Sequence, residues 1–298
     1  MFSAFCSHII TQKSKINSIN VFPVPDQDTG SNLASTFEKV KKELDRHKFS
    51  TIQALSDSIG KTSLYAAQGN SGIIYTGFIA GFFDALTSDS NKMTSEVICN
   101  AFREGTKKAY SSIEVPQKGT ILDVMDAVVV CMESECKKKD CSIEEMFRLS
   151  FIAGKKALDN TKQQMAVLRE SDVVDAGGLA FVMMLESFYE CLTGKKLDIS
   201  QESEVVILKN GSSSITSNRY EVVFILKDSL LIPADIKDMF SELGDSMDIV
   251  EVSDAIKFHI HTDQPQIVKE IALSLGTIVF LQIMDMKEEK VLELIEIE

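Results

Sequence analysis

The sequence lacks the features that mark a membrane or secreted protein. No apolar run reaches the roughly 18 residues that a membrane-spanning helix needs. The first residues, MFSAFCSHIITQKSK, have no basic segment in front of an apolar core, so a secretory signal peptide is not expected. The sequence therefore predicts a cytoplasmic protein without a membrane span.

Positive charge is scarce as well. The 298 residues include 31 Lys and Arg against 44 Asp and Glu, which gives a formal net charge of −13. Bulk nucleic-acid binding depends on a basic surface, so we expect no nucleic-acid partner. Hydrophobic residues make up 44% of the chain and charged residues 25%, which is typical of folded globular proteins, and the length suffices for two ordinary domains.

The cysteines follow no common zinc pattern. Cys131, Cys136 and Cys141 are five residues apart, a spacing that scatters them around a helix axis. Thiols of a cytoplasmic chain are mostly reduced. We interpret the six cysteines as ordinary thiols, with a metal or redox site as the alternative.

Residues 33 to about 193 predict one helix after another. The segment LASTFEKVKKELDRH places Leu33, Phe37 and Val40 at helical spacing opposite a charged face. The segment SGIIYTGFIAGFFDALT is more apolar all round, so it predicts a buried helix. The sequence therefore predicts a helical first domain, residues 1–194, of seven to eight helices.

The character of the sequence changes near Gly194, where TGKKLDISQESE predicts a polar linker. After it, RYEVVFILK, DIVEVS, AIKFHIHT and TIVFLQI predict strands. Between them, PADIKDMFSELG and QPQIVKEIALSLG predict short helices that end in glycine. The order β-α-β-β-α-β over residues 203–298 predicts a small ferredoxin-like domain, so the fold class is α followed by α/β.

One loop in front of the first predicted helix, NVFPVPDQDTGSN, combines two carboxylates with a glycine. Asp26 and Asp28 project to one side of an extended backbone, and Mg²⁺ commonly takes one or two protein carboxylates and leaves its other positions to water and phosphate. Gly30 allows a tight turn, and Asn32 can cap the helix that follows. A phosphate beside that helix would meet free N–H groups. The alternative is that both aspartates only form turns and a cap.

Three further helix-opening loops carry the same residue types. AAQGNSGII contains Gly69, Asn70, Ser71 and Gly72, which allow backbone N–H groups to approach an anion, although an ordinary turn between helices has the same composition. QKGTILD places Thr120 and Asp123 at another helix start, and SDVVDAGGLAF places Asp175 and Gly177 at a fourth. Four such loops in one helical domain exceed what capping requires, so they predict a nucleotide-phosphate site.

These motifs, in this order, resemble the nucleotide-binding domain shared by dihydroxyacetone kinases and bacterial fatty acid kinases. NVFPVPD-x-DTG is most similar to the ATP-binding subunit of fatty acid kinase, and FHIHTD in the second half is similar to that subunit's middle domain. The resemblance implies an antiparallel helical barrel with ATP at one end. It implies that Asp26, Asp28 and Asn20 hold Mg²⁺, that Gly69–Gly72 contacts phosphates, and that Thr120, Asp123, Asp175 and Gly177 line the nucleotide pocket.

The sequence departs from the family pattern at three points. Gln27 stands between the aspartates where the family usually has glycine, which bears on the metal geometry. Glu221 stands in the first long strand of the second domain where the family usually has a cysteine. The chain also stops at Glu298, without the family's large C-terminal domain, so activity of this length of chain by itself stays open.

The second domain contains a candidate zinc site. His259 and His261 lie at alternate positions of one predicted strand and therefore point to the same face. Glu221 on a neighbouring strand completes the candidate ligand set. The alternative is a strand face with two ordinary histidines.

The sequence thus favours an ATP- and Mg²⁺-dependent phosphotransferase. By resemblance, it transfers the γ-phosphoryl group to a fatty acid held by a separate fatty-acid-binding protein, for use in phospholipid metabolism. No residue stands out as a general base, since phosphoryl transfer depends mainly on positioning and charge neutralisation. The alternatives are a non-catalytic nucleotide or metal-binding module and a dihydroxyacetone-like small-molecule kinase. Whether the chain forms a homodimer is left open.

Overall fold

The computed structural model describes residues 1–298 except 24, 89–92, 139–140, 198–217, 289 and 298. Its contacts divide the chain into two compact units. The first, here called the helical unit, comprises Met1–Tyr110 and Pro116–Ser214, and the second, the sheet unit, comprises Ser111–Val115 and Ile215–Glu298. Most of the predicted linker and the predicted start of the second domain at residue 203 lie outside the described residues, so the boundary at 194 and 203 stays a prediction.

The described part of the helical unit contains nine helices, compared with the seven to eight that the sequence predicts, and the N-terminal helix α1 and the short helix α8 are the unpredicted ones. The described helices are α1 (Phe2–Ser18), α2 (Thr29–Arg46), α3 (Ile52–Ala66), α4 (Gly69–Ser88), α5 (Ser95–Ser111), α6 (Ile121–Cys136), α7 (Ile143–Gln164), α8 (Ala166–Glu170) and α9 (Ala176–Thr193). The helical fold class is therefore confirmed. Among the described helices, none combines the length and the apolar character needed to cross a membrane.

The core of the helical unit is built largely from aromatic side chains. Phe78 of α4 packs edge to face against Phe181 of α9, with ring centroids 5.1 Å apart. Phe5 of α1 packs against Phe37 of α2 in the same way at 4.7 Å, an arrangement that aromatic rings prefer. The helices α4 and α9 have apolar residues on nearly all sides, and each is therefore buried over most of its surface.

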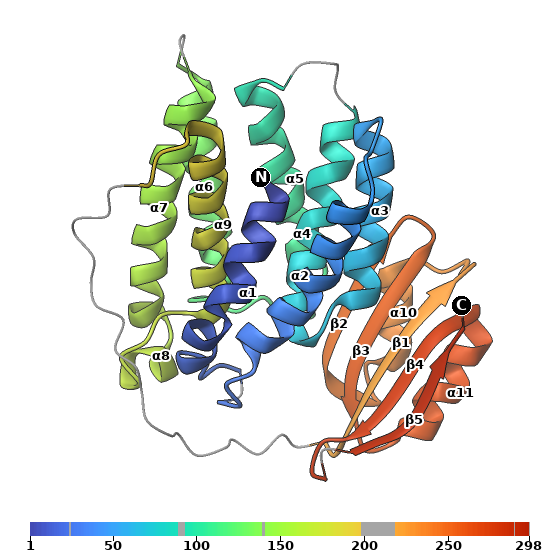
Figure 1. Cartoon of the computed structure of the whole chain (residues 1–298). Helices are drawn as coiled ribbons and strands as arrows, with labels where there is room; N and C mark the ends of the chain where they lie inside the picture. The colour runs from blue at the N-terminus through green and yellow to red at the C-terminus, as the bar shows by residue number, and fades with distance from the viewer. Residues whose placement is uncertain (24, 89–92, 139–140, 198–217, 289, 298) are drawn as a thin grey trace. The chain divides into compact units, whose positions relative to one another are not determined.

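Successive helices alternate in direction, which sorts their ends into two groups (Figure 1). The starts of α2, α4, α6 and α9 lie at one end of the helical unit. The ends of α4 and α6 and the starts of α5 and α7 lie at the opposite end. All four loops that the sequence predicts to bind a nucleotide precede helices that start at the first end.

The sheet unit is an antiparallel five-stranded sheet with two helices. Its strands are β1 (Tyr220–Lys227), β2 (Gly244–Val252), β3 (Ala255–Thr262), β4 (Thr277–Asp285) and β5 (Lys290–Glu296), and its helices are α10 (Pro233–Phe240) and α11 (Pro265–Leu275). The strand order is β2-β3-β1-β4-β5. The first four strands and both helices follow the predicted β-α-β-β-α-β order, and β5 is an addition at the edge.

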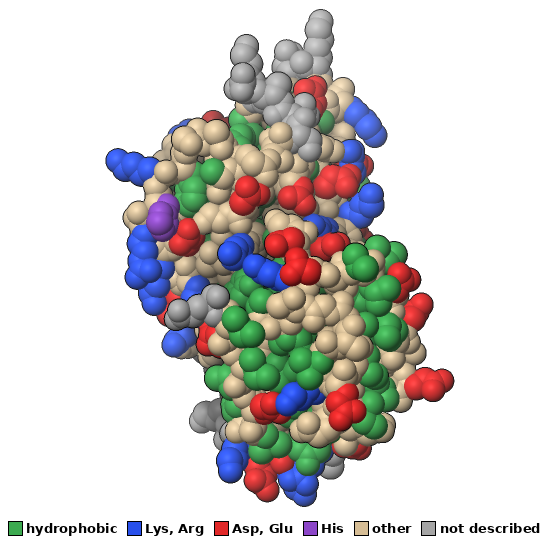
Figure 2. All heavy atoms as spheres, turned by 90° about the vertical axis from the view of Figure 1, so that its right-hand side faces the viewer, with side chains coloured by type: hydrophobic (Ala, Val, Ile, Leu, Met, Phe, Trp, Pro, Cys, Tyr) green, Lys and Arg blue, Asp and Glu red, His purple; other side chains and the backbone are tan. Residues whose placement is uncertain are grey.

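The two faces of this sheet differ in chemistry. Phe224 of β1 and Phe258 of β3 pack with Ile236 and Phe240 of α10 and Val268 of α11 in one apolar core, so both helices cover the same face. Alternation along the strands places Glu221, His259 and His261 on the other face. Apolar side chains gather on one side of the sheet unit's surface (Figure 2), and the edge strand β5 exposes Val291, Leu292 and Leu294.

A short segment after α5 also belongs to the sheet unit. Ile113 forms an isolated antiparallel bridge with Asp248 of β2, and the Ile249 N–H donates to the Ser112 carbonyl at 2.9 Å. The chain then enters the loop that contains Gly119 and Thr120. The connection between α5 and α6 therefore extends the sheet at β2 before it reaches one of the predicted nucleotide loops.

Candidate functional site

The loop that carries Asp26 and Asp28 is held by an asparagine at its start. The Asn20 side chain is only 2% exposed, and its Oδ1 accepts the N–H groups of Asp28 and Thr29 at 3.1 and 2.9 Å. Its Nδ2 donates to the Phe22 carbonyl at 3.1 Å. In this arrangement Asn20 positions the carboxylate loop, and its predicted role as a direct Mg²⁺ ligand stays a prediction.

Gln27, between the two aspartates, adopts the left-handed backbone conformation with φ of +57°. Glycine takes this conformation at no steric cost, whereas other L-residues lose about 1–2 kcal/mol. Gln27 therefore adopts, at the cost of local strain, a backbone conformation that glycine would take freely.

The carboxylate of Asp28 lies close enough to Asp26 to affect the pKa of Asp26. Partial withdrawal from water and the neighbouring Asp28 carboxylate raise the pKa of Asp26 to about 7. The Asp28 Oδ2 accepts the Asn32 amide at 2.9 Å, which fixes its orientation. Two carboxylates whose charges oppose each other in this way form an arrangement that a divalent cation would stabilise.

Asn32 links this loop to the start of α4. A Cβ added at Gly69, whose φ is +61°, would lie 2.8 Å from the Asn32 Nδ2, so glycine allows this close approach. Within the described part of the chain, no acceptor takes the N–H groups of Gly69, Asn70 and Ser71. These three donors at a partly exposed helix start are available to an anion. Gly72 packs closely against the backbone of Ala67.

The start of α2 offers fewer free N–H groups to a phosphate than the sequence predicts. The Ser31 N–H donates to the Asn17 Oδ1 of α1 at 3.0 Å, and the Asn20 Oδ1 accepts the N–H groups of Asp28 and Thr29. Most N–H groups that were expected to be free for a phosphate there are therefore bonded to these two asparagine side chains. Gly30 serves packing: an added Cβ would lie 2.2 Å from the Lys13 carbonyl oxygen, so α1 and α2 approach as closely as only glycine allows.

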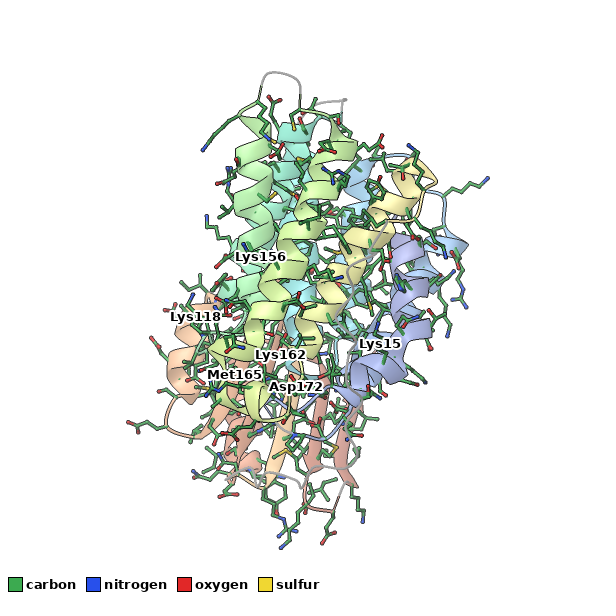
Figure 3. All side chains as sticks on the ribbon, turned by 90° about the vertical axis from the view of Figure 1, so that its left-hand side faces the viewer. Lys15, Lys118, Lys156, Lys162, Met165 and Asp172 are labelled. Carbon is green, nitrogen blue, oxygen red and sulfur yellow. The ribbon has the colours of Figure 1, made fainter. Side chains whose placement is uncertain are left out.

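The third loop, before α6, is closed by its own aspartate. The Asp123 Oδ2 accepts the Gly119 N–H at 2.6 Å, and the Asp123 Oδ1 lies 3.3 Å from the Lys118 ammonium. Gly119 has a φ of +81° and lies against Met165. Thr120 donates its hydroxyl to the Gln117 carbonyl at 2.8 Å. Lys118 and Met165 lie at the same end of the helical unit in Figure 3.

The fourth loop is joined to the second and the third. The Asp175 Oδ2 accepts the Gly178 N–H at 2.7 Å and caps α9, and a Cβ added at the nearby Gly177 would lie 3.4 Å from the Ile121 Cβ at the start of α6. The Tyr75 hydroxyl of α4 donates to the Gly177 carbonyl at 3.3 Å. Burial raises the pKa of Asp175 to about 6, although the Gly178 N–H lowers it.

The structure therefore brings the four predicted loops together at one end of the helical unit. Asn32 joins the first loop to the second, Tyr75 joins the second to the fourth, and the contact of Gly177 with Ile121 joins the fourth to the third. Asp123 and Asp175 use their carboxylates to cap helices, so any part they take in a nucleotide pocket is additional to that task. Asn17 and Tyr75 were not predicted, because both are single residues within helices whose partners come from other elements.

The second candidate site lies on the helix-free face of the sheet unit. One ligand atom from each of Glu221, His259 and His261 can be chosen so that all lie within 4.8 Å of one another. The His259 Nε2 is 3.0 Å from the Glu221 Oε1, and the His259 Nδ1 is 3.8 Å from the Asp248 Oδ2. The Nδ1 atoms of both histidines and the Asp248 Oδ2 are buried without a hydrogen-bond partner among the described residues.

The pKa values of the two histidines in this cluster are shifted in opposite directions. Burial opposes a charge on His259, but the carboxylates of Asp248 and Glu221 outweigh it and raise the pKa of His259 to about 9. Burial and the neighbouring His259 lower the pKa of His261 to about 4. The Nδ1 atoms of His259 and His261 and the Oδ2 of Asp248 lack hydrogen-bond partners among the described residues. A cation would fit there, since burying a polar atom without a partner costs free energy. The juxtaposition was predicted, whereas Asp248 was not.

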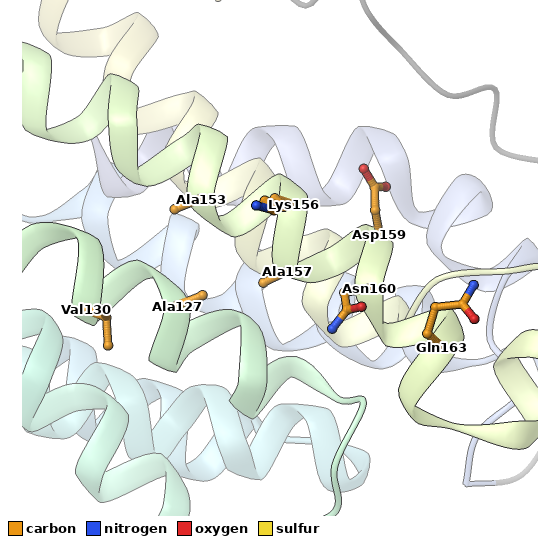
Figure 4. Close-up of a pocket in the computed structure, with 8 residues that line it drawn as sticks. All are labelled: Ala127, Val130, Ala153, Lys156, Ala157, Asp159, Asn160 and Gln163. Carbon is orange, nitrogen blue, oxygen red and sulfur yellow. The ribbon is translucent and has the colours of Figure 1, made fainter.

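A groove between α6 and α7 is separate from both clusters. Its lining combines three alanines and a valine with four polar side chains: Ala127, Val130, Ala153, Lys156, Ala157, Asp159, Asn160 and Gln163 (Figure 4). It contains no convergent set of carboxylates or free N–H groups comparable to the four loops. We therefore do not assign the nucleotide to this groove.

Comparison with known families matches both units. Residues 23–190 match the DAK2 domain, and residues 217–291 match the middle domain of FakA-like fatty acid kinase proteins. The chain belongs to the DAK2 domain family, and it combines this domain with a FakA-like middle domain. The family relationship supports a kinase-like, nucleotide-binding module.

Similar proteins add the following context. Uncharacterized proteins of Staphylococcus aureus strains USA300 and NCTC 8325 are each 27% identical over 289 residues, which covers 92% of this chain and 52% of theirs. The chain thus spans about half the length of the curated relatives it matches. A crystal structure of the dihydroxyacetone kinase from C. freundii with AMP-PNP and Mg²⁺ has a TM-score of 0.49 and 16% identity, over 64% of this chain and 33% of that one.

Proposed function

We propose that the helical unit binds ATP with Mg²⁺ and that the chain acts as the ATP-binding subunit of a fatty acid kinase. One observation carries the proposal. Two mutually repelling carboxylates, Asp26 and Asp28, are joined through Asn32 to a helix start whose first three N–H groups have no acceptor among the described residues. A metal site and an anion site therefore adjoin, as a metal–triphosphate complex requires.

In this proposal each part of the site has a separate task. The N–H groups of Gly69, Asn70 and Ser71 donate to phosphate oxygens. Asp26 and Asp28 hold Mg²⁺, which supplies charge neutralisation on the phosphates when bound. Asn20 keeps the carboxylate loop in place through its two backbone hydrogen bonds. The rest of the proposed nucleotide pocket is lined by Thr120, Asp123, Asp175 and Gly177.

The acceptor is proposed to be the carboxylate of a fatty acid presented by a separate fatty-acid-binding protein. A carboxyl group with an ordinary pKa near 4 is already ionised at neutral pH, so its oxygen can attack the γ-phosphorus without a general base. An alcohol acceptor such as dihydroxyacetone would need its proton removed. In this proposal the described carboxylates at the four loops have other tasks, since Asp26 and Asp28 hold Mg²⁺ and Asp123 and Asp175 cap helices.

We further propose that the sheet unit holds Zn²⁺ through His259, His261 and Glu221. Support comes from the short separation of their ligand atoms and from the buried nitrogens without partners. The role would be structural, since the ion would connect β1 and β3, whereas the phosphate donors lie on the helical unit. A carboxylate in place of a thiolate predicts weaker zinc binding than a Cys-His-His set would give.

The kinase assay incubates the full chain with ATP, Mg²⁺ and a fatty-acid-loaded binding protein, and traps the acyl phosphate with hydroxylamine as a hydroxamate. The proposal expects hydroxamate only when ATP, Mg²⁺ and the loaded protein are all present. A second arm offers dihydroxyacetone, for which no phosphorylated product is expected. ATP binding without product in any arm would favour the non-catalytic module and contradict the kinase assignment.

A further inference from the structure

The two edge strands of the sheet, β2 and β5, differ in what lies beside them. Another segment of the chain covers the edge at β2, where the Ile249 N–H donates to the Ser112 carbonyl and Ile113 forms a bridge with Asp248. No strand or loop of the described residues covers the outer side of β5 in this way. An edge strand carries unpaired backbone N–H and C=O groups, so an uncovered one is a template for pairing with another strand.

The backbone of β5 directs alternate residues toward β4 and away from it. The Ile297 N–H donates to the Val279 carbonyl at 3.0 Å. Because main-chain groups alternate along an antiparallel strand, those of Leu294 and Glu296 point away from β4, to the free edge. The register of β5 with β4 shifts once, before Glu293, so regular pairing is available in the second half of β5.

The side chains of β5 are more apolar than a strand in contact with water requires. Val291, Leu292, Leu294 and Ile297 are exposed, and Leu294 exposes 58% of its surface. Most of the large hydrophobic side chains that are exposed among the described residues belong to the sheet unit, although it is the smaller of the two units. Exposed apolar side chains that gather in this way mark a surface for another protein chain.

The charges of β5 favour an antiparallel partner of the same sequence. Glu293 is paired with Lys269 of α11, so its charge is already offset. Lys290 at the start of β5 and Glu296 at its end have no ion-pair partner among the described residues. Antiparallel pairing of two β5 strands brings each Lys290 to the end that carries the partner subunit's Glu296, whereas parallel pairing would place like charges side by side.

We infer that two copies of this chain associate through their β5 strands, which pair antiparallel about a two-fold axis near Leu294. In this register Leu294 lies opposite Leu294 of the partner subunit, and Glu293 lies opposite the partner's Ile295. An axis at Glu293 or at Glu296 would instead place two identical carboxylates opposite each other, which is destabilising. The main-chain groups of Leu294 point to the free edge, as a hydrogen-bonded pair at the axis requires.

This pairing would join two five-stranded sheets into one continuous sheet. Glu293 faces α11, because its partner Lys269 lies there, so alternation places Leu294 on the helix-free face. The two Leu294 side chains would then shield each other from water on that face. Because a two-fold interface uses the same strand from both copies, association stops at the dimer. The inference is independent of the proposed kinase function.

Sedimentation velocity of the full chain measures the association. The inference predicts that the parent, of 33.0 kDa, sediments with about twice that mass at high concentration and dissociates on dilution. Leu294→Lys would place two ammonium groups opposite each other at the axis, so it should raise Kd at least about tenfold. The matched control, Leu230→Lys, changes an exposed leucine after β1 and should associate like the parent. Circular dichroism at 222 nm verifies that both variants remain folded.

Cross-linking tests the register of the pair. Leu294→Cys would place two thiols opposite each other, within reach of a short bismaleimide reagent, so a covalent dimer is expected on a denaturing gel. Leu230→Cys and the parent, which carry the same six native cysteines, should show only the background. Equal cross-linking of the parent and Leu294→Cys would overturn the inference. So would Leu294→Lys that associates as tightly as the parent, or a parent that stays monomeric at its highest soluble concentration, which would leave β5 to a different strand.

Discussion

Replacement of Asp175 by asparagine tests how the fold tolerates a buried carboxyl at the centre of the four loops. Asp175 is only 7% exposed, and its Oδ2 accepts the Gly178 N–H at 2.7 Å. Burial raises its pKa from an ordinary 3.8 to about 6. Asparagine has nearly the same shape and keeps an oxygen for the helix cap, but it cannot ionise. The variant therefore isolates the effect of the charge.

The raised pKa of Asp175 determines whether this group increases or decreases the free energy of unfolding as the pH rises. Between about pH 4 and pH 6 the folded protein retains a proton on Asp175 that the unfolded chain has lost. Since the folded state then binds more protons, this group lowers the stability as pH rises through that window. A shift from 3.8 to about 6 corresponds to about 3 kcal/mol in full, of which about 2 kcal/mol falls between pH 4.5 and pH 7.5.

Urea unfolding of the full chain and of Asp175→Asn, followed by circular dichroism at 222 nm, measures this difference. We expect the free energy of unfolding of the variant to rise relative to the parent by about 2 kcal/mol from pH 4.5 to pH 7.5. Other carboxyl groups titrate in both proteins and therefore cancel. A difference that stays constant across this range would refute the raised pKa and the reasoning from burial.

The remaining predictions address packing, domain division and the second metal site. Gly30→Ala should destabilise the helical unit by about 1–3 kcal/mol in urea unfolding, because its Cβ would meet the Lys13 carbonyl oxygen; unchanged stability would contradict the close contact of α1 and α2. A chain ending at Lys195 should melt cooperatively as a helical protein, and a non-cooperative melt would reject the predicted boundary. Glu221→Cys should tighten zinc binding, as measured by competition with a zinc chelator, since thiolate is the softer ligand; zinc absent from the parent and from this variant would leave His259 and His261 as ordinary strand residues.

The main helices could be predicted from the sequence because their signals are local. α2 alternates Leu33, Phe37 and Val40 with charged residues, and these three side chains are buried. α1 escaped prediction because no side chain caps it and its buried residues, Phe5, Cys6, Ile9 and Ile16, are interspersed with polar ones. The grouping of the four loops was inferred from their shared composition, whereas the contacts that join them depend on residues such as Tyr75 from other helices.

In the sheet unit, the sequence predicted some members of the histidine cluster but not the carboxylates beside them. His259 and His261 were predicted to share a strand face from alternation, and Glu221 was added because it stands where the resembling family has a cysteine. Asp245 and Asp248 are three residues apart and would face opposite sides of a regular strand. A register shift between them, with Ser246 at a φ of +56°, pairs Asp245 with His261 and Asp248 with His259. A bulge of this kind is fixed by tertiary pairing, so the sequence did not reveal these carboxylates. β5 was missed because it is an edge strand whose residues are mostly exposed.

The central claim is that Asp26 and Asp28 bind the metal of a nucleotide complex at the end of the helical unit. Isothermal titration calorimetry of ATP with Mg²⁺ compares the parent with the double variant Asp26→Asn and Asp28→Asn. The matched control, Asp57→Asn with Asp159→Asn, removes the same charge from exposed helix positions. The account predicts that the first double variant loses at least about tenfold in affinity, or about 1.4 kcal/mol, and that the control binds like the parent. Equal affinity for ATP and Mg²⁺ in the parent and in the Asp26 and Asp28 variant would contradict the account.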